Sequence, residues 1–147
     1  TDPSRREGQS LGGRILLIED EANISEAIGF ILSREGWNVQ GHGNGATAMD
    51  ALKRQLPDLV VLDVMLPGRS GLDILRDLRA DPGLNKVPVL MLTAKGQAKD
   101  RETAMSLGAN AFLTKPFSNT DLVDTLHDLA RAADLAIPGQ SGGPATA

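Results

Sequence analysis

Several residue types are missing or scarce in this chain, and each absence excludes a class of protein. The 147 residues include no cysteine, which excludes a disulfide framework and a thiolate metal site and agrees with a reducing compartment. No apolar run approaches the roughly 18 residues of a membrane-spanning helix, and no signal-peptide pattern opens the sequence. We therefore expect a cytoplasmic protein that makes no contact with a membrane.

The charge and the aromatic content narrow the choice of ligand. The formal net charge is −4 and no basic stripe with interleaved aromatic residues occurs, which argues against direct binding of nucleic acid. Aromatic residues make up 3% of the chain, and one Trp with no Tyr leaves little to stack on a flavin ring.

Small, turn-forming residues gather at the two ends of the chain. Residues 1–13 and 135–147 contain few large apolar side chains, as is typical of flexible tails or linker stubs. We therefore expect one folded domain at 14–134, long enough to bury a proper core. The sequence starts at Thr1 and not at Met, so we expect that the chain was processed or cut from a longer protein.

Four short apolar runs each lead into a polar residue. The runs begin at Ile15, Leu59, Val89 and Ala111, and they lead into Glu19-Asp20, Asp63, Thr93 and Lys115 respectively. Such runs are typical of strands that are buried on both faces of a parallel sheet. Open α/β sheets build their sites at the carboxyl ends of the strands. Three carboxylates, one hydroxyl and one ammonium at that edge predict a site for phosphate and metal.

Helical patterns alternate with these runs. Apolar stripes, serine caps and terminal glycines predict helices at 22–35, after Ala48, after Ser70, within 98–107 and from Ser118. A short strand at 37–39 and a turn at 41–45 complete the pattern. Five alternations predict an α/β fold, a doubly wound (βα)5 parallel sheet with right-handed crossovers. The alternation leaves the strand order open.

The polar residues that follow these apolar runs also resemble those of a known family. Glu19-Asp20, Asp63 with Pro67-Gly68 and Gly71, Thr93-Ala94 and Lys115-Pro116-Phe117 closely resemble the receiver (response regulator) domain of two-component signalling, over roughly 14–131. The segments 65–68 and 113–117 are most similar to receivers of winged-helix transcription factors. The resemblance implies a flavodoxin-like strand order, 2-1-3-4-5, and a phosphoaccepting signalling protein, not an enzyme with a separate substrate.

The chemistry of these polar residues agrees with this resemblance. Asp63 would be the nucleophile that attacks phosphorus in a phosphohistidine or a small acyl phosphate and becomes an aspartyl phosphate. Asp20 and Asp63 are hard oxygen ligands suited to Mg²⁺, with Mn²⁺ as an alternative. Lys115 would place a positive charge on a phosphoryl oxygen, because phosphoryl transfer depends mostly on positioning and charge neutralisation.

The resemblance assigns further roles. It implies that the backbone carbonyl of Met65 is a third metal ligand and that Glu19 helps directly or through water. It also implies that Thr93 donates its hydroxyl to the phosphoryl group as the loop from Ala94 moves inward, while Phe112 swings to fill the space. The peptide bond between Lys115 and Pro116 is expected to be cis. The movements of Thr93 and Phe112 would alter the surface formed by the fourth helix, the fifth strand and the fifth helix.

Two further expectations concern the phosphodonor partner and the lifetime of the aspartyl phosphate. We expect a sensor histidine kinase or a histidine phosphotransferase to dock at the start of the first helix, around Asn23, Ile24 and Ala27. By resemblance, Met65 and Lys95 flank the path of the hydrolytic water. Met65 cannot orient a water and Lys95 can obstruct one, so we expect an aspartyl phosphate that lasts minutes to hours.

The output is less determined by the sequence. The expected target is a downstream protein or an output domain outside this chain. Asp100-Arg101 fit the class of receivers that pair symmetrically through salt bridges, but Asn110-Ala111 replace the acidic residues usual there. We therefore expect a monomer or a weak, phosphorylation-dependent dimer.

Simpler interpretations and other functions remain open at this stage. Asp63 could open a turn, Glu19-Asp20 could cap a helix, Thr93 could be an ordinary strand residue, and Lys115 could be solvated. One alternative function is a Mg²⁺-dependent hydrolase, but such enzymes commonly carry a second acid where Met65 stands. Another is a phosphorylation-independent interaction module, but such modules usually lack the acceptor Asp or the Lys, and both are present here. His42, in the turn, and His127, on a helix, are expected to be surface residues without a metal.

Overall fold

The structure of the protein is a computed structural model, which describes residues 13–94 and 97–135. Its centre is a five-stranded parallel sheet in the order β2-β1-β3-β4-β5. The strands are β1 (Arg14–Ile18), β2 (Asn38–His42), β3 (Leu59–Asp63), β4 (Val89–Ala94) and β5 (Ala111–Lys115). The predicted doubly wound sheet and its strand order are confirmed.

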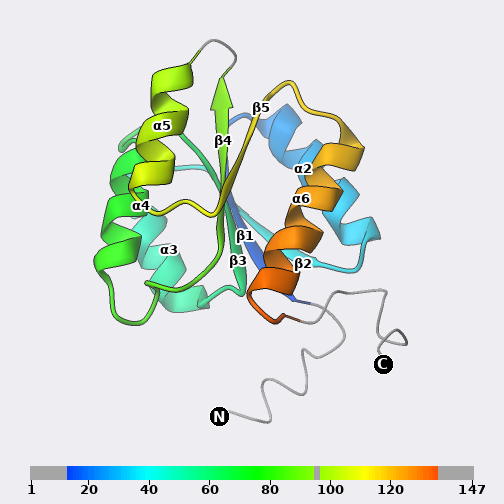
Figure 1. Cartoon of the computed structure of the whole chain (residues 1–147), viewed down its shortest axis with the longest axis horizontal. Coiled ribbons are helices and arrows are strands. Elements are labelled where there is room, and N and C mark those ends of the chain that lie inside the picture. Colours follow the sequence, from blue (N-terminus) through cyan, green and yellow to red (C-terminus); the bar gives the residue numbers. More distant parts are fainter. Residues whose placement is uncertain (1–12, 95–96, 136–147) are drawn as a thin grey trace.

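Helices cover both faces of the sheet (Figure 1). They are α2 (Ala22–Arg34), α3 (Ala48–Gln55), α4 (Gly71–Ala80), α5 (Ala98–Ser106) and α6 (Asn119–Ala132), with a short 3-10 turn η1 (Gly45–Thr47) before α3. α2 and α6 pack on one face, and α3, α4 and α5 pack on the other (Figure 1). No helix in 13–94 or 97–135 combines the length and the apolar character that a membrane crossing needs.

The central strands are buried because helices cover them on both sides. All five residues of β3 are buried, and so are Ile15–Ile18 of β1. Alternate residues of each strand point into two separate apolar clusters: Leu16 and Ile18 lie under α3 and α4, whereas Ile15 and Leu17 lie under α2 and α6. The continuous apolar runs of the sequence follow from this double covering.

The helix ends use the signals found in the sequence. The hydroxyl of Ser118 accepts a hydrogen bond of 2.9 Å from the backbone N–H of Asp121, and that of Ser70 accepts one of 3.1 Å from Leu72. Ser118 and Ser70 therefore cap α6 and α4. Gly36 and Gly108 follow α2 and α5 with φ of 97° and 108°, the left-handed conformation that glycine adopts without strain.

The two edge strands differ from the sequence prediction. β2 extends to His42, so Gly41 and His42 belong to a strand and not to a turn; they pair with Leu17 and Ile18 of β1. β5 was expected to be buried, but all five of its residues are only partly buried because no strand lies beyond it. His127 is more buried than expected: only 13% of its side chain is exposed, and its Nε2 lies 3.9 Å from Oε1 of Glu35, at the end of α2.

The predicted tails lie almost wholly outside the described residues. At the borders, the carbonyl of Gly13 accepts a hydrogen bond from the N–H of Asn38, and Leu135 packs against the cluster under α2 and α6.

Candidate functional site

The polar residues of the site lie at the carboxyl ends of four adjacent strands. Glu19 follows β1, Asp63 ends β3, Thr93 lies near the end of β4, and Lys115 ends β5. Glu19, Asp63 and Thr93 have exposed fractions of 3%, 2% and 1%, and they are the only buried polar or charged residues in the part of the chain that the structure describes. A buried carboxylate is costly unless it is compensated, so this concentration marks a site.

Gly71 allows α4 to start directly against the end of β3. Its backbone N–H donates a hydrogen bond of 2.9 Å to the carbonyl of Val64. A Cβ atom at this position would lie only 2.0 Å from the backbone oxygen of Asp63, so any other residue would displace the strand end.

Three carboxylates face one another at this edge. Glu19, Asp20 and Asp63 each offer an oxygen, and these oxygens all lie within 4.8 Å of one another. Asp20 is exposed, whereas the other two are buried. Three negative charges at this separation repel one another, and hard oxygen donors of this kind suit Mg²⁺. The donor set therefore fits a small divalent cation.

Lys115 is the cation that the described residues supply to this cluster. Its Nζ lies 3.0 Å from Oε1 of Glu19, 3.2 Å from Oδ2 of Asp63 and 3.7 Å from Oε1 of Glu21. Burial alone would lower the pKa of Lys115, but the hydrogen bond to Glu19 and the charge of Asp63 outweigh it and raise the pKa. Lys115 is therefore held in its charged form.

The nucleophile candidate has a perturbed pKa. Burial, followed by the charge of Glu19, raises the pKa of Asp63 from 3.8 to about 6, while Lys115 and the N–H of Met65 act in the opposite direction. At neutral pH the carboxylate is ionised but only partly compensated. A cation bound beside it would relieve this cost.

Thr93 points its hydroxyl toward weak partners. Its Oγ1 lies 3.4 Å from the carbonyl of Leu113 and 3.4 Å from Oγ1 of Thr114, both at the long limit of a hydrogen bond. In the sheet, Asp63 pairs with Leu92, which places Thr93 one residue beyond the acid. A hydroxyl held this weakly can turn to a stronger acceptor.

The geometry can now be compared with known proteins. Residues 15–127 match the family model described as the response regulator receiver domain. The chain belongs to the response regulator receiver family. Receivers are signalling phosphoacceptors, and this function agrees with a buried carboxylate between an acidic cluster and a lysine.

Curated proteins that are similar to this chain are bacterial transcriptional regulators. The chain is 44% identical over 128 residues to the probable transcriptional regulatory protein TcrX of Mycobacterium tuberculosis, covering 86% of this chain and 53% of that protein. It is 38% identical over 118 residues to the phosphate regulon transcriptional regulatory protein PhoB of Escherichia coli, covering 80% and 52%. The chain thus spans about half the length of the curated relatives it matches.

Solved structures share the fold. The signal receiver domain of a histidine kinase from Syntrophus aciditrophicus superposes with a TM-score of 0.78 at 30% identity, covering 85% of this chain and 95% of that one. The BeF3-activated receiver domain of RstA from Klebsiella pneumoniae gives 0.75 at 28% identity, covering 80% and 98%.

Other predicted positions surround the acidic cluster of the receiver. The N–H of Met65 lies 3.4 Å from Oδ1 of Asp63, and 67% of Met65 is exposed. The peptide bond between Lys115 and Pro116 is cis. Lys95 lies outside the described residues, so its relation to the site stays a prediction.

Phe112 lies on β5, away from the carboxylates. Its ring is partly buried against the cluster under α4 and α5, and the guanidinium of Arg101 lies 4.9 Å from the ring centroid. A cation over the face of a ring is attracted to it. Sequence reasoning did not connect Arg101 with Phe112, because the contact depends on how α5 packs beside β5.

Glu21 is a second contact that sequence reasoning missed. It follows the acidic pair Glu19-Asp20 directly, which is the one signal that could have suggested it. Its carboxylate reaches Lys115 although 62% of the side chain is exposed. The spacing of the sequence alone could not show that this side chain turns toward the site.

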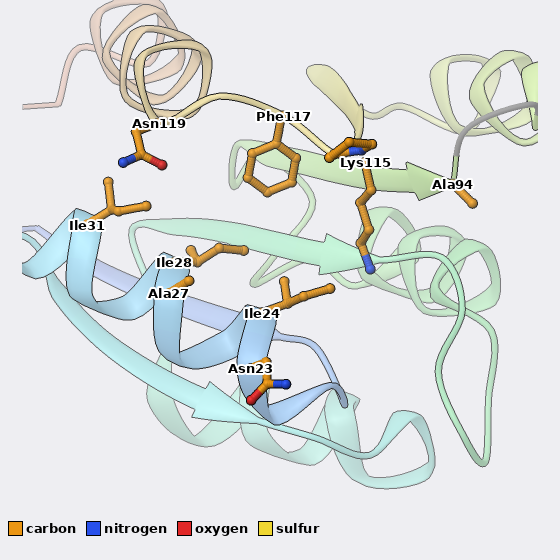
Figure 2. A pocket seen from close by; sticks show the side chains of 10 residues that line it. Asn23, Ile24, Ala27, Ile28, Ile31, Ala94, Lys115, Phe117 and Asn119 are labelled. Atoms are coloured by element: carbon orange, nitrogen blue, oxygen red, sulfur yellow. The ribbon is translucent and has the colours of Figure 1, made fainter.

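A groove adjoins the site on the side of α2 (Figure 2). It has a volume of about 520 Å³ and is lined by Asn23, Ile24, Ala27, Ile28, Ile31, Ala94, Lys115, Pro116, Phe117 and Asn119. The three residues predicted for kinase docking all line this groove. Figure 2 shows Ile24 and Phe117 beside it, with Lys115 extending from β5 at one end.

Proposed function

We propose that this receiver accepts a phosphoryl group on Asp63, from a histidine kinase, a histidine phosphotransferase or a small acyl phosphate. The observation that carries the proposal is a buried carboxylate 3.2 Å from Nζ of Lys115, in a cluster whose carboxylate oxygens lie within 4.8 Å of one another. Such a site can compensate the charge of a phosphoryl group while it presents an oxygen nucleophile.

The transfer is a substitution at phosphorus. An oxygen of Asp63 forms a bond to phosphorus as the bond to the donor's nitrogen or oxygen breaks, and the electron pair leaves with the donor. Lys115 is already close enough to Asp63 to move onto a phosphoryl oxygen. The weakly held hydroxyl of Thr93 then donates a hydrogen bond to another phosphoryl oxygen.

The carboxylates would hold the metal. Asp20, Asp63 and the backbone carbonyl of Met65 are the proposed ligands for Mg²⁺, which when bound neutralises charge on the phosphoryl oxygens. Glu19 already uses both oxygens: Oε1 accepts from Lys115 and Oε2 accepts from the N–H of Glu21, each at 3.0 Å. Contact through water is therefore the better role for Glu19.

The response would travel through Thr93 and Phe112. Movement of Thr93 and Ala94 toward the phosphoryl group would vacate space on β4, and Phe112 of the neighbouring strand would move into it. This change alters the surface of α5, β5 and α6, where we place the contact with a downstream protein or with an output domain outside this chain. The curated relatives named above are transcriptional regulators, which favours the second arrangement.

Intact-mass measurement tests the acceptor. After incubation with acetyl phosphate or phosphoramidate and Mg²⁺, the protein should gain one phosphoryl group, and EDTA should suppress the gain. Asp63→Asn should remove it, whereas Asp50→Asn, which changes an exposed carboxylate on α3, should not. Undiminished labelling of Asp63→Asn would overturn the assignment.

A further inference from the structure

A donor as small as acetyl phosphate would leave most of the groove that adjoins Lys115 empty. We propose that the groove binds the apolar chain of an acyl phosphate, so that the receiver takes phosphoryl groups from phosphorylated medium-chain carboxylic acids more readily than from acetyl phosphate. The inference rests on the phosphoacceptor function proposed above and names a substrate class for the same site.

The lining of the groove matches an apolar chain. Ile24, Ile28, Ile31 and Phe117 supply large apolar side chains, of which Ile28 is only 1% exposed. Two neutral amides, Asn23 and Asn119, are the other polar side chains besides Lys115 among the lining residues. A hydrocarbon chain would be removed from water here, whereas a charged chain would find no charged partner among the described residues of the wall apart from Lys115.

The charge lies at one end of the groove, next to the acceptor. Among the described residues that line the groove, Lys115 is the charged one, and its Nζ is 3.2 Å from Asp63. A ligand with one anionic end and one apolar end can therefore place its phosphate at Lys115 and its chain along α2. Figure 2 shows this order, with Lys115 at one end and Ile31 toward the other.

The length of the groove sets the preferred chain. Ile24 and Ile31 are seven residues apart on one helix, so the apolar wall extends about 10 Å, which accommodates an extended hexanoyl chain with some length to spare. A hexanoyl chain would contact the wall over most of this length, whereas the methyl group of acetyl phosphate would reach only its start.

The chemical step is the same for every acyl phosphate. One oxygen of the Asp63 carboxylate bonds to phosphorus, the bond from phosphorus to the acyl oxygen breaks, and its electron pair leaves with the carboxylate of the acid. Nucleophile and leaving group are both carboxylates, so no proton is transferred. Differences in the labelling rate along a series of acyl phosphates therefore report how the acyl chain of the donor is bound.

Labelling rates with acetyl, butyryl and hexanoyl phosphate at one Mg²⁺ concentration test the inference. Complete burial of a CH₂ group gives roughly a fourfold gain, and a half-open groove a little less than twofold. The additional CH₂ groups of hexanoyl phosphate should therefore make it label Asp63 about tenfold faster than acetyl phosphate. Ala27→Asp places a charge in the groove and should bring this ratio to about one. Ser33→Asp adds the same charge to an exposed position of α2 outside the groove and should keep the ratio.

Binding provides a readout that does not depend on transfer. Hexylphosphonate, which cannot donate a phosphoryl group, should bind the Mg²⁺-loaded protein about tenfold more tightly than ethylphosphonate in titration calorimetry, and Ala27→Asp should abolish the difference. Equal rates along the donor series and equal phosphonate affinities would overturn the inference while labelling of Asp63 by acetyl phosphate still stood. If a flat series accompanies slower transfer from a kinase in Ala27→Asp, the groove belongs to a partner helix alone. If no donor labels Asp63, the phosphoacceptor function fails, and the phosphonate affinities decide the groove by themselves.

Discussion

At the scale of single residues, the state of Asp63 couples function to stability. Its pKa rises from 3.8 to about 6 in the folded protein without metal, first through burial and then through the charge of Glu19. The folded state therefore binds this proton more tightly than the unfolded chain does. The free energy of unfolding consequently falls as pH rises from about 4 through about 6, and stays lower above that range.

Replacing Asp63 with Asn should remove this loss of stability at higher pH. In EDTA near pH 8, we expect Asp63→Asn to be more stable than the parent by on the order of 1–2 kcal/mol, and the difference should shrink toward zero near pH 4. Urea unfolding at the two pH values measures it, with Asp50→Asn as the control for an exposed carboxylate. Equal or lower stability of Asp63→Asn near pH 8 would show that the acceptor is already compensated.

The lifetime of the aspartyl phosphate also depends on single residues. Met65 is exposed beside Asp63 and has no group that can orient a water. By resemblance to the family, we expect Lys95 on the other side of the water's path. We expect the phosphorylated state to last minutes to hours. Met65→Asn combined with Lys95→Glu should speed the loss of phosphate about tenfold, which corresponds to about 1.4 kcal/mol of barrier.

Loss of the added mass over time measures this rate. The single variants serve as controls, because each changes only one side of the path. A parent half-life of seconds, or a double variant no faster than the parent, would mean that other residues set the lifetime.

At the scale of elements, the start of α2 lies between the acidic cluster and the groove. Ile24 is partly buried one turn after Asp20, and it lines the groove together with the exposed Asn23 and Ala27. A helix of a kinase or phosphotransferase could cover this surface while its histidine reaches Asp63. We expect Ile24→Asp to slow phosphotransfer from the cognate kinase much more than it slows labelling by acetyl phosphate.

Parallel measurements with the two donors decide this prediction. Ser33→Asp, farther along α2 and outside the groove, should leave transfer from the kinase close to that of the parent. Equal slowing with both donors in Ile24→Asp would locate the damage in the fold and not in docking.

The elements differ in how far the sequence predicts them. β1, β3 and β4 are covered on both faces, so their continuous apolar runs identify them, and Ser70 and Ser118 locate the starts of two helices. β2 is mostly polar and ends in Gly41-His42, and its extent depends on pairing with β1, which no local pattern shows. The sequence also predicts that the polar residues at the carboxyl ends of the strands lie together, because parallel strands end at the same edge of the sheet.

The rest of the site depends on the relative placement of helices and strands. The contact of Glu21 with Lys115 requires the start of α2 to turn toward β5. The groove exists only because α2 and the segment from Lys115 to Asn119 lie side by side. Neither feature has a sequence spacing of its own, because the residues that form it are about 90 positions apart.

At the scale of the whole molecule, we expect the surface of α5, β5 and α6 to be where two receivers would pair. Asn110 stands where an acidic residue is usual, and its Oδ1 accepts hydrogen bonds of 2.8 Å from both Arg79 and the N–H of Val89. Arg101 lies over the ring of Phe112 within its own chain. Both side chains are engaged internally, so the surface offers little for symmetric salt bridges, and exposed pairs contribute little in any case.

We therefore expect this chain to remain a monomer, or at most to pair weakly, after phosphorylation. Sedimentation velocity with and without acetyl phosphate and Mg²⁺ measures it, and Asp63→Asn under the same conditions provides the unphosphorylated reference. Arg101→Ala should leave the sedimentation coefficient of the phosphorylated protein unchanged, because Arg101 is used on Phe112 and not on a second copy. A stable dimer that forms on phosphorylation and is lost in Arg101→Ala would instead mean that Arg101 leaves Phe112 in the active state, and that phosphorylation releases the residue that joins two receivers.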